Sequence, residues 1–376
     1  MTTAGAHNDR FDVAVIGAGP AGSAAARWLA LRGARVALIE RTSLDTPRVG
    51  ESLASAVQPL LAMLGLWNDF LALHPLPSFG TCSYWGEYTP QVHSHMMSPW
   101  GCGWHVDRLS FDRMLAEGAC RAGAVLLLRT TLANCETTPT GWRFTLREPG
   151  TERVVRRLSA RILIDATGRA ARCATHMGTY RLPLDHLVAT AVRLDGADVD
   201  RESYVMVETT ADGWWYSAPI PGGRMIAMLM TDVDLCREMR LNSSRSWEAR
   251  LDAATFTAER LSRLRRLTAP QLCSAASHRL RRSGQPQACL AVGDAALAVD
   301  PVSGSGVVRA LRTARAGAEA TSAVLETGSS DALSVYEGER DFECTRYLEE
   351  RALYYGFERR WAGQPFWERR SVVAAR

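Results

Sequence analysis

The sequence contains no lysine, because all 44 of its basic residues are arginines. Chemistry that needs a lysine amine, as a nucleophile or as a proton carrier, is therefore excluded. Long apolar runs are also missing, and no stretch approaches the ~20 apolar residues of a membrane helix. The first ten residues are polar and lack the apolar centre of an export signal. We expect a cytoplasmic protein that does not contact a membrane.

Strong charge and metal-binding patterns are also missing. The net charge of +4 is small and dispersed, which argues against a nucleic-acid partner. The nine cysteines include no C-x-x-C pair, so we expect reduced thiols. His93 and His95 have no third ligand at a suitable spacing, and we predict no metal site. The remaining composition, 47% hydrophobic over 376 residues, suits a globular protein of two closely joined domains.

The first informative segment is a glycine motif between a strand and a helix. Residues 11–16 are apolar and partly β-branched, as in a buried parallel strand, and residues 23–32 have a helical pattern. A G-x-G-x-x-G motif in this setting indicates a Rossmann dinucleotide site, whose phosphates lie at the helix N-terminus. The residues that we assign to the cofactor here are Gly17, Gly19, Pro20, Ala21 and Gly22.

Polar residues after this unit are further candidates for the dinucleotide. Glu40 ends the second strand, about 20 residues after the glycines, where a carboxylate accepts ribose hydroxyls. Arg41 follows it. Arg48 beside Gly50 suits a phosphate or a planar ring, although a surface turn explains this pair equally well. Arg108, at the start of a predicted amphipathic helix, is a second candidate for the phosphates.

Two later segments predict a second and a third wall around the same ligand. A strand over 161–164 delivers small residues that let backbone close over a dinucleotide. Another strand ends near 293, where an aspartate can bind ribityl hydroxyls and a proline can lie beside a ring. The helix that follows can point its positive end at the flavin. The cofactor residues assigned to these segments are Asp165, Gly168, Gly293, Asp294, Pro301, Gly304, Ser305, Gly306 and Val307.

Together, the segments 17–22, 165–168 and 293–301 resemble FAD enzymes with the para-hydroxybenzoate hydroxylase fold. Val49-Gly50-Glu51-Ser52 and the aromatic segment 213–221 resemble the flavin-dependent halogenase branch of that superfamily. Within it, the chain is similar to halogenase-like flavoproteins that oxidise tryptophan during cysteine tryptophylquinone biogenesis. The resemblance spans nearly the whole chain. It implies FAD as cofactor, O2 as co-substrate, and a reductant that is NAD(P)H used directly or through a separate flavin reductase.

Two departures from the family pattern bear on the reaction. Halogenases use a lysine to receive hypohalous acid, and this chain has none. Their Trp-x-Trp-x-Ile-Pro signature is also displaced here, with Trp214 and Trp215 adjacent. The segment 165–168 is not the Asp-Gly pair of hydroxylases that bind NADPH directly, which favours a separate reductase as partner.

The predicted fold class is α/β (α+β overall), a Rossmann-type FAD-binding domain with an antiparallel-sheet substrate domain and a helical tail. Between 182 and 272 the sequence changes to alternating strands joined by tight turns, as in a sheet that covers the flavin. We place the FAD-binding domain at 1–75, 105–175 and 273–335, the substrate domain at 76–104 and 176–272, and the C-terminal helical segment at 336–376.

Aromatic residues in the substrate domain are candidates for the pocket. Successive side chains of a strand alternate between faces, so the three aromatics at 214–216 cannot all point inward. The pocket candidates are Tyr84, Trp85, Trp214, Trp215, Tyr216 and Ser303. We also name His74 and Glu87 as candidate catalytic bases that would act on a hydroxylated aromatic substrate.

The function predicted from this resemblance is hydroxylation of an electron-rich aromatic, of indole or phenol type, through a flavin C4a-hydroperoxide. The substrate is either a metabolite or a tryptophan side chain of a partner protein. Three alternatives stay open: a flavin halogenase, a flavin reductase or dehydrogenase acting on a double bond, and a flavin-binding maturation or interaction protein.

Overall fold

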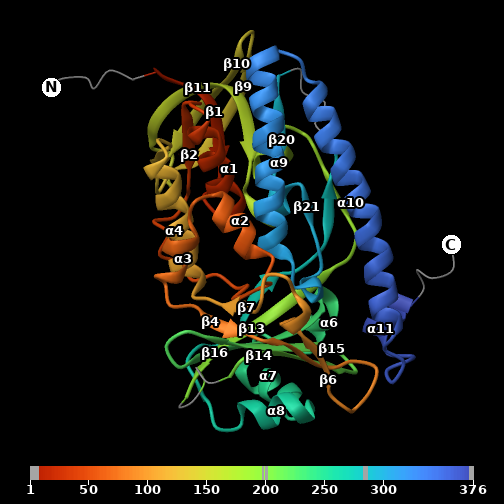
Figure 1. Cartoon of the computed structure of the whole chain (residues 1–376). Helices are drawn as coiled ribbons and strands as arrows, with labels where there is room; N and C mark the ends of the chain where they lie inside the picture. The colour runs from red at the N-terminus through yellow and green to blue at the C-terminus, as the bar shows by residue number, and fades with distance from the viewer. Residues whose placement is uncertain (1–7, 197–198, 200–201, 283–286, 372–376) are drawn as a thin grey trace.

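The computed structural model describes residues 8–196, 199, 202–282 and 287–371. Its upper part in Figure 1 is a seven-stranded sheet in the order β8-β2-β1-β11-β10-β9, with β20 paired to the end of β11. The strands are β1 (Asn8–Ile16), β2 (Val36–Ile39), β8 (Val125–Leu127), β9 (Thr131–Thr138), β10 (Gly141–Arg147), β11 (Val154–Asp165) and β20 (Cys289–Ala291).

Three of the parallel strands of this sheet end side by side. Ile16 at the end of β1 pairs with Asp165 at the end of β11, and Asp165 pairs with Ala291 at the end of β20. Each glycine-containing segment leaves the sheet at one of these ends. The register of the sheet therefore brings together three segments that are far apart in the sequence.

Helices pack around this sheet and beside one another. Long helices α9 and α10 lie next to each other and form one side of the molecule (Figure 1). The alanine-rich α1 has a fully buried face, because small side chains allow it to pack closely on β1 and α9. These helices are α1 (Pro20–Leu31), α2 (Val57–Met63), α3 (Trp67–Leu71), α4 (Arg108–Arg121), α5 (Arg172–His176), α9 (Gly306–Thr327), α10 (Asp331–Gly356) and α11 (Pro365–Ser371).

The lower part of the molecule is an eight-stranded sheet in the order β17-β13-β16-β15-β14-β5-β6, with β18 paired to the same edge of β13 as β17. All of its pairs are antiparallel except β5 with β14. Its strands and neighbouring helices are β5 (Gly80–Tyr84), β6 (Gln91–Ser94), β13 (Leu187–Asp195), β14 (Tyr204–Thr210), β15 (Gly213–Ile220), β16 (Arg224–Asp232), β17 (Arg265–Arg266), β18 (Gln271–Ser274), α6 (Val233–Glu238), α7 (Ser244–Leu251) and α8 (Thr255–Leu261).

Two three-stranded sheets connect the large ones. Their strands are β3 (Ser52–Leu53), β4 (Leu76–Ser78) and β7 (Gly103–His105) in one, and β12 (Arg181–Pro183), β19 (His278–Leu280) and β21 (Leu297–Ala298) in the other. The first lies beside β15, so it sits between the upper and lower parts of the molecule. No described helix is long and apolar enough to cross a membrane.

The predicted α/β class with its Rossmann-type unit is confirmed. The tail begins its helix at Asp331 rather than near 336, and residues 372–376 of the predicted C-terminal segment lie outside the described residues. The predicted domain boundaries stay a prediction. In the segment assigned to the substrate domain, β4 pairs with β7 and not with the eight-stranded sheet.

Candidate functional site

The first two glycine segments approach each other so closely that side chains would not fit. Gly17 has a φ of +105°, and a Cβ there would lie 2.4 Å from the carbonyl oxygen of Ala166. A Cβ on Gly22 would lie 1.8 Å from the carbonyl oxygen of Gly17. The turn, the helix start and the end of β11 therefore form one wall made largely of backbone, as the glycine motif predicts.

The third segment closes against the first two. Gly293 has a φ of +61°, and a Cβ there would lie 2.7 Å from that of Ala21. Arg169 donates hydrogen bonds to the carbonyl oxygens of Ala275, Ala276 and Val299, and its Nε lies 3.4 Å from Oδ2 of Asp294. One arginine of the second segment thus fixes the position of the third. Sequence reasoning placed Arg169 beside the motif but gave it no role.

A cavity of about 1400 Å³ runs along these segments and on to the inner face of the eight-stranded sheet. This volume exceeds the 300–1,000 Å³ that is typical of a small-molecule pocket. A cavity of this size accommodates an elongated ligand together with a second molecule. The predicted site residues that line it are Gly17, Gly19, Pro20, Ala21, Glu40, Arg41, Arg48, Gly50, Arg108, Gly168, Trp214, Tyr216, Asp294, Pro301, Ser303, Gly304, Gly306 and Val307.

Four residues predicted to bind the cofactor do not line the cavity: Gly22, Asp165, Gly293 and Ser305. The carboxylate of Asp165 is buried, and it accepts hydrogen bonds from the N–H and Oγ1 of Thr167 and from the N–H of Ala174. Burial raises its pKa, against the lowering effect of these hydrogen bonds. Asp165 therefore shapes the turn after β11 rather than contacting a ligand in the cavity.

Glu40 and the two candidate arginines form a connected group around Asp112. Glu40 accepts hydrogen bonds from the N–H groups of Ala18 and Thr42, each at 3.0 Å. Arg108 forms ion pairs with Asp112 and also donates to the carbonyl oxygen of Val49 at 2.7 Å. The side chain of Arg48 is 34% exposed, and its nitrogens lie 3.5 Å and 3.6 Å from the two carboxylates. Arg48 is thus the better placed of the two arginines to bind a phosphate.

The substrate end of the cavity is lined by apolar side chains from the inner face of the eight-stranded sheet. Alternate residues of β13, β14, β15 and β16 point to it, because successive side chains of a strand lie on opposite faces. They are Ala189, Ala191, Arg193, Val205, Val207, Trp214, Tyr216, Ile226, Met228 and Met230. Sequence reasoning missed most of these residues, although the two-residue period of 189, 191 and 193 was visible in the sequence.

The side chain of Trp214 is fixed by a buried chain of hydrogen bonds. Its Nε1 donates to the hydroxyl of Tyr355 at 3.0 Å, and that hydroxyl donates to Oδ2 of Asp300 at 2.8 Å. Asp300 lines the cavity directly before Pro301. Burial raises the pKa of Asp300, and the hydrogen bond from Val302 opposes this effect. Helix α10 thereby connects the substrate end of the cavity with the third glycine segment.

The hydroxyl of Tyr216 is held in a second chain. It donates to Oγ of Ser52 at 2.8 Å, and Oγ of Ser52 lies 2.9 Å from Nδ1 of His105. Burial lowers the pKa of His105 to about 3, with smaller contributions from Arg260 and His95. The imidazole is therefore neutral at pH 7. Burial also raises the pKa of Tyr216, so its phenol stays protonated.

A buried ion pair lies beside this chain. Arg193 donates to the carbonyl oxygen of Arg48 at 3.1 Å and lies 3.4 Å from Oε1 of Glu51. Burial raises the pKa of Glu51, whereas Arg193 and the N–H of Gly50 lower it. Arg193 is a charged group among apolar neighbours on the sheet. Sequence reasoning did not identify it.

The two residues proposed as bases do not reach the cavity. His74 is exposed, in a turn with a φ of +51°. Glu87 is exposed in the connection between β5 and β6, where it accepts a hydrogen bond from Thr89 at 3.0 Å. Neither residue lines the cavity, so the structure corrects this part of the prediction.

Three of the six pocket candidates also lie elsewhere. Tyr84 stacks on Phe256 at 3.7 Å between ring centroids. Trp85 is buried against Tyr354 and other aromatics of the tail. Trp215 points to the opposite face from Trp214 and packs against Trp247. The alternation along β15 explains this outcome, since Trp214 and Tyr216 share the inner face.

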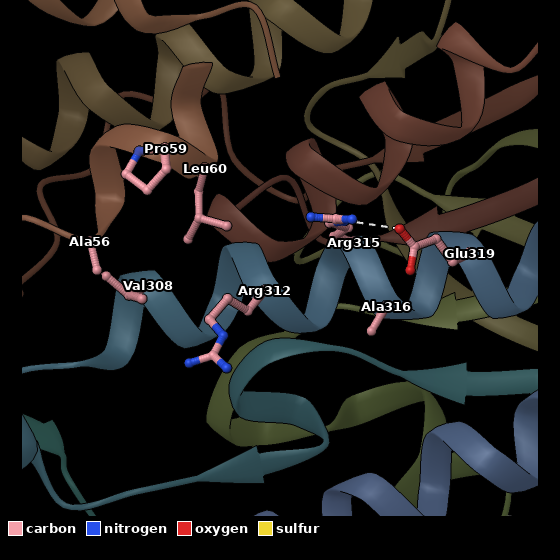
Figure 2. A pocket seen from close by; sticks show the side chains of 8 residues that line it. All are labelled: Ala56, Pro59, Leu60, Val308, Arg312, Arg315, Ala316 and Glu319. Atoms are coloured by element: carbon pink, nitrogen blue, oxygen red, sulfur yellow. Dashed lines mark hydrogen bonds and ion pairs between the residues drawn. The ribbon is translucent and has the colours of Figure 1, made fainter. Parts of the chain in front are cut away.

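A smaller hollow of about 360 Å³ lies between α2 and α9 (Figure 2). Pro59 and Leu60 line one side, and Arg315 forms an ion pair with Glu319 along the other at 2.9 Å. None of the predicted site residues lines it. In the described residues, no group of three or more histidine, cysteine or acidic side chains is placed to hold a metal ion.

The residues present fit FAD. Three walls of backbone meet at the place where the protein backbone must approach the phosphates of a dinucleotide closely. The first turns of α1 and α9 both line the cavity there. Residues 16–21, 40–50 and 292–307 would hold it, with Glu40 near the ribose and Arg48 near the phosphates as the sequence predicts.

Comparisons with known proteins agree with this geometry. The FAD binding domain family matches residues 10–350. LodB of Marinomonas mediterranea, named as an FAD-dependent oxidoreductase, is 30% identical over 370 residues, which cover 98% of each chain. A myxobacterial chondrochloren halogenase has a similar fold, with a TM-score of 0.89, 24% identity, and coverage of 98% of this chain and 87% of that one.

A further solved structure is pqsL of Pseudomonas aeruginosa, whose name describes an FAD-dependent monooxygenase. It has a TM-score of 0.75 and 20% identity, and the match covers 94% of this chain and 99% of that one. Family, relative and fold therefore agree with the three-walled cavity. The chain belongs to the FAD binding domain family and is an FAD-dependent oxidoreductase.

Proposed function

We propose that this protein is an FAD-dependent monooxygenase that hydroxylates an electron-rich aromatic of indole or phenol type. One observation carries the proposal. The cavity continues without a break from the glycine walls to an apolar surface bearing Trp214 and Tyr216. A planar aromatic substrate fits such a surface, because it can pack against apolar side chains and aromatic rings.

The chain's own residues supply binding, orientation and exclusion of water. When bound, FAD supplies the activation of O2, which is the co-substrate. Val207, Met228 and Met230 make the substrate end apolar, and a dry site favours transfer of oxygen over loss of the oxidant to water. Trp214 and Tyr216 have fixed side chains, so they hold a substrate ring in a defined position.

The substrate in this proposal is either a free metabolite or a tryptophan side chain of a partner protein. Leu272 on β18 lines the cavity and is 56% exposed. Its neighbours Gln271 and Ser274 also line the cavity and are exposed. The cavity thus reaches the surface along β18. This opening supports entry of a side chain that is attached to a larger molecule.

The reductant in this proposal is NAD(P)H, used directly or through a separate flavin reductase. The segment 165–168 favours the separate reductase, since it lacks the Asp-Gly pair of hydroxylases that bind NADPH. A flavin reductase would then be a partner of this protein. Consumption of NADH and NADPH by the purified flavoprotein, with and without an added reductase, distinguishes the two routes.

The test of the reaction uses the FAD-loaded protein, reduced without oxygen and then mixed with ¹⁸O2. The probes are free tryptophan, a simple indole, a simple phenol and a tryptophan-containing peptide, each with and without chloride or bromide. Gain of one ¹⁸O atom by any probe supports hydroxylation. Gain of a halogen instead overturns the proposal in favour of a halogenase. Return of the flavin to its oxidised state with neither oxygen nor halogen gained by any probe also overturns it, and favours a reductase or dehydrogenase.

A further inference from the structure

The outer face of α10 carries large apolar side chains where a solvated helix is normally polar. Val335, Phe342, Leu353 and Phe357 are 65%, 66%, 64% and 58% exposed. The opposite face of α10 packs on the protein through Leu333, Tyr336, Arg340, Tyr347 and Tyr355, which are buried. Figure 1 shows α10 along one side of the molecule, beyond α9. The outer face is thus an exposed apolar surface on an element that is itself firmly packed.

The spacing of these residues places them in one line. Helical positions seven residues apart, such as Val335 and Phe342, are about two turns apart and share a side. Positions eleven residues apart, such as Phe342 and Leu353, are about three turns apart and again share a side. Phe357 lies one turn beyond Leu353, just after the end of the helix. The four residues therefore form a stripe, which we call the α10 stripe.

Two opposite charges interrupt the stripe at its middle. Arg346 and Glu349 are exposed and lie between Phe342 and Leu353 on the same side of the helix. Arg346 pairs within the chain with Glu350 at 3.0 Å, in an exposed pair with 62% and 69% side-chain exposure. Such exposed surface pairs contribute little to stability. Arg346 is therefore able to exchange this partner for another carboxylate.

From this pattern we propose that the α10 stripe binds the α10 stripe of a second copy of this chain, in antiparallel orientation. In that arrangement Phe342 of each copy faces Leu353 of the other. Arg346 of each copy then faces Glu349 of the other, which gives two ion pairs related by the two-fold axis. A parallel arrangement would place Arg346 against Arg346 and is disfavoured by repulsion. The charges thus select a self-complementary, antiparallel dimer.

The proposal goes beyond the redox function and also links the interface to the cavity. Tyr354, next to Leu353, lines the cavity, and Tyr355 holds Trp214 through its hydroxyl. A dimer along α10 would therefore support the helix that positions the substrate end. The outcome for the dimer proposal is independent of the outcome for the proposed reaction, because the test measures molecular mass and not turnover.

The experiment is light scattering of the full-length, FAD-loaded protein over a range of concentrations. A mass of twice 41.2 kDa is expected for the wild type. Arg346→Glu is expected to weaken dimerisation at least tenfold, since it places two carboxylates together twice in the interface. The double variant Arg346→Glu/Glu349→Arg restores the opposite charges across the interface and is expected to dimerise again.

A mixture of the two single variants sharpens this test. Copies with Arg346→Glu and copies with Glu349→Arg are expected to form mixed dimers, although each alone is monomeric. Val92→Ser, at an exposed apolar position on β6, is the matched control and leaves the mass unchanged. A monomeric wild type at every concentration overturns the proposal. A dimer that Arg346→Glu leaves intact also overturns it, because the interface then lies elsewhere.

Discussion

The two ends of the cavity are built from different parts of the chain. At the dinucleotide end, the walls are backbone, and a Cβ on Gly22 would lie 1.8 Å from a carbonyl oxygen. At the substrate end, the walls are side chains from one face of a sheet, and Trp214 differs from Trp215 only in the direction it points. At Gly17 and Gly22 the first end has no room for a side chain, whereas the second end depends on which side chains are present. The cofactor and the substrate specificity therefore have separate structural origins.

The largest effect is expected at the backbone end, from Gly22→Ala. The added methyl group collides with the carbonyl of Gly17 and with Ala166, so α1 must move away from β1 and β11. We expect loss of most bound FAD, together with a fall of several kcal/mol in the free energy of unfolding, on the order of 3 kcal/mol or more. The ratio of flavin to protein absorbance and urea unfolding measure the two changes.

Gly33→Ala is the matched control for this substitution. Gly33 ends α1 with a φ of +84°, but nothing lies within 4 Å of an added Cβ. Only the backbone conformation is penalised, at about 1–2 kcal/mol. FAD content should therefore stay normal. If both variants retained FAD equally, close packing of the three segments would not be what holds the cofactor.

The second prediction separates the two faces of β15. Trp214→Phe removes the hydrogen bond to Tyr355 and reshapes the substrate end, so we expect about a tenfold fall in kcat/KM with the fold intact. Trp215→Phe should leave kcat/KM within about twofold and lower the free energy of unfolding by about 1–3 kcal/mol, because Trp215 packs against Trp247 in the core. Equal effects of the two variants on kcat/KM would contradict the assignment of the inner face.

The same contrast explains how much could be predicted from the sequence. Glycines that must accept a positive φ or a close contact have no substitute, so the motif around Gly17 indicated the dinucleotide end correctly. The fold class and the strands of the second sheet followed from the apolar patterns. The pocket side chains were harder, because the sequence gives the alternation along a strand but not which of its faces is covered by a helix.

Two wrong predictions illustrate this limit. His74 and Glu87 were chosen for their chemistry from an irregular region, where no periodicity indicates direction, and both are exposed. Neither Arg193 nor Ser52 was predicted to line the cavity, although both do. Their positions depend on how β13 and β3 are placed by other strands far along the chain, which a single sequence does not state.

The smallest effect is expected from the histidine between the two ends of the cavity. His105 is buried and has a pKa of about 3 in the folded protein, below the 6.5 of an ordinary histidine. As the pH falls below 6.5, the unfolded chain takes up this proton first. The stability contributed by neutral His105 is thus complete above pH 6.5 and is lost progressively from pH 6.5 towards pH 3.

Between pH 7 and pH 5.5 this histidine should lower the free energy of unfolding by about 1 kcal/mol, which urea unfolding at each pH can measure. His105→Gln keeps a polar group beside Ser52 and should remove that part of the pH dependence. His74→Gln, at an exposed site, should not change it. His278, whose pKa burial lowers to about 4, contributes in the same direction and stays unchanged in both variants. An unaltered slope in His105→Gln would mean that His105 has the same pKa in the folded and the unfolded protein, and would contradict the lowering of its pKa by burial.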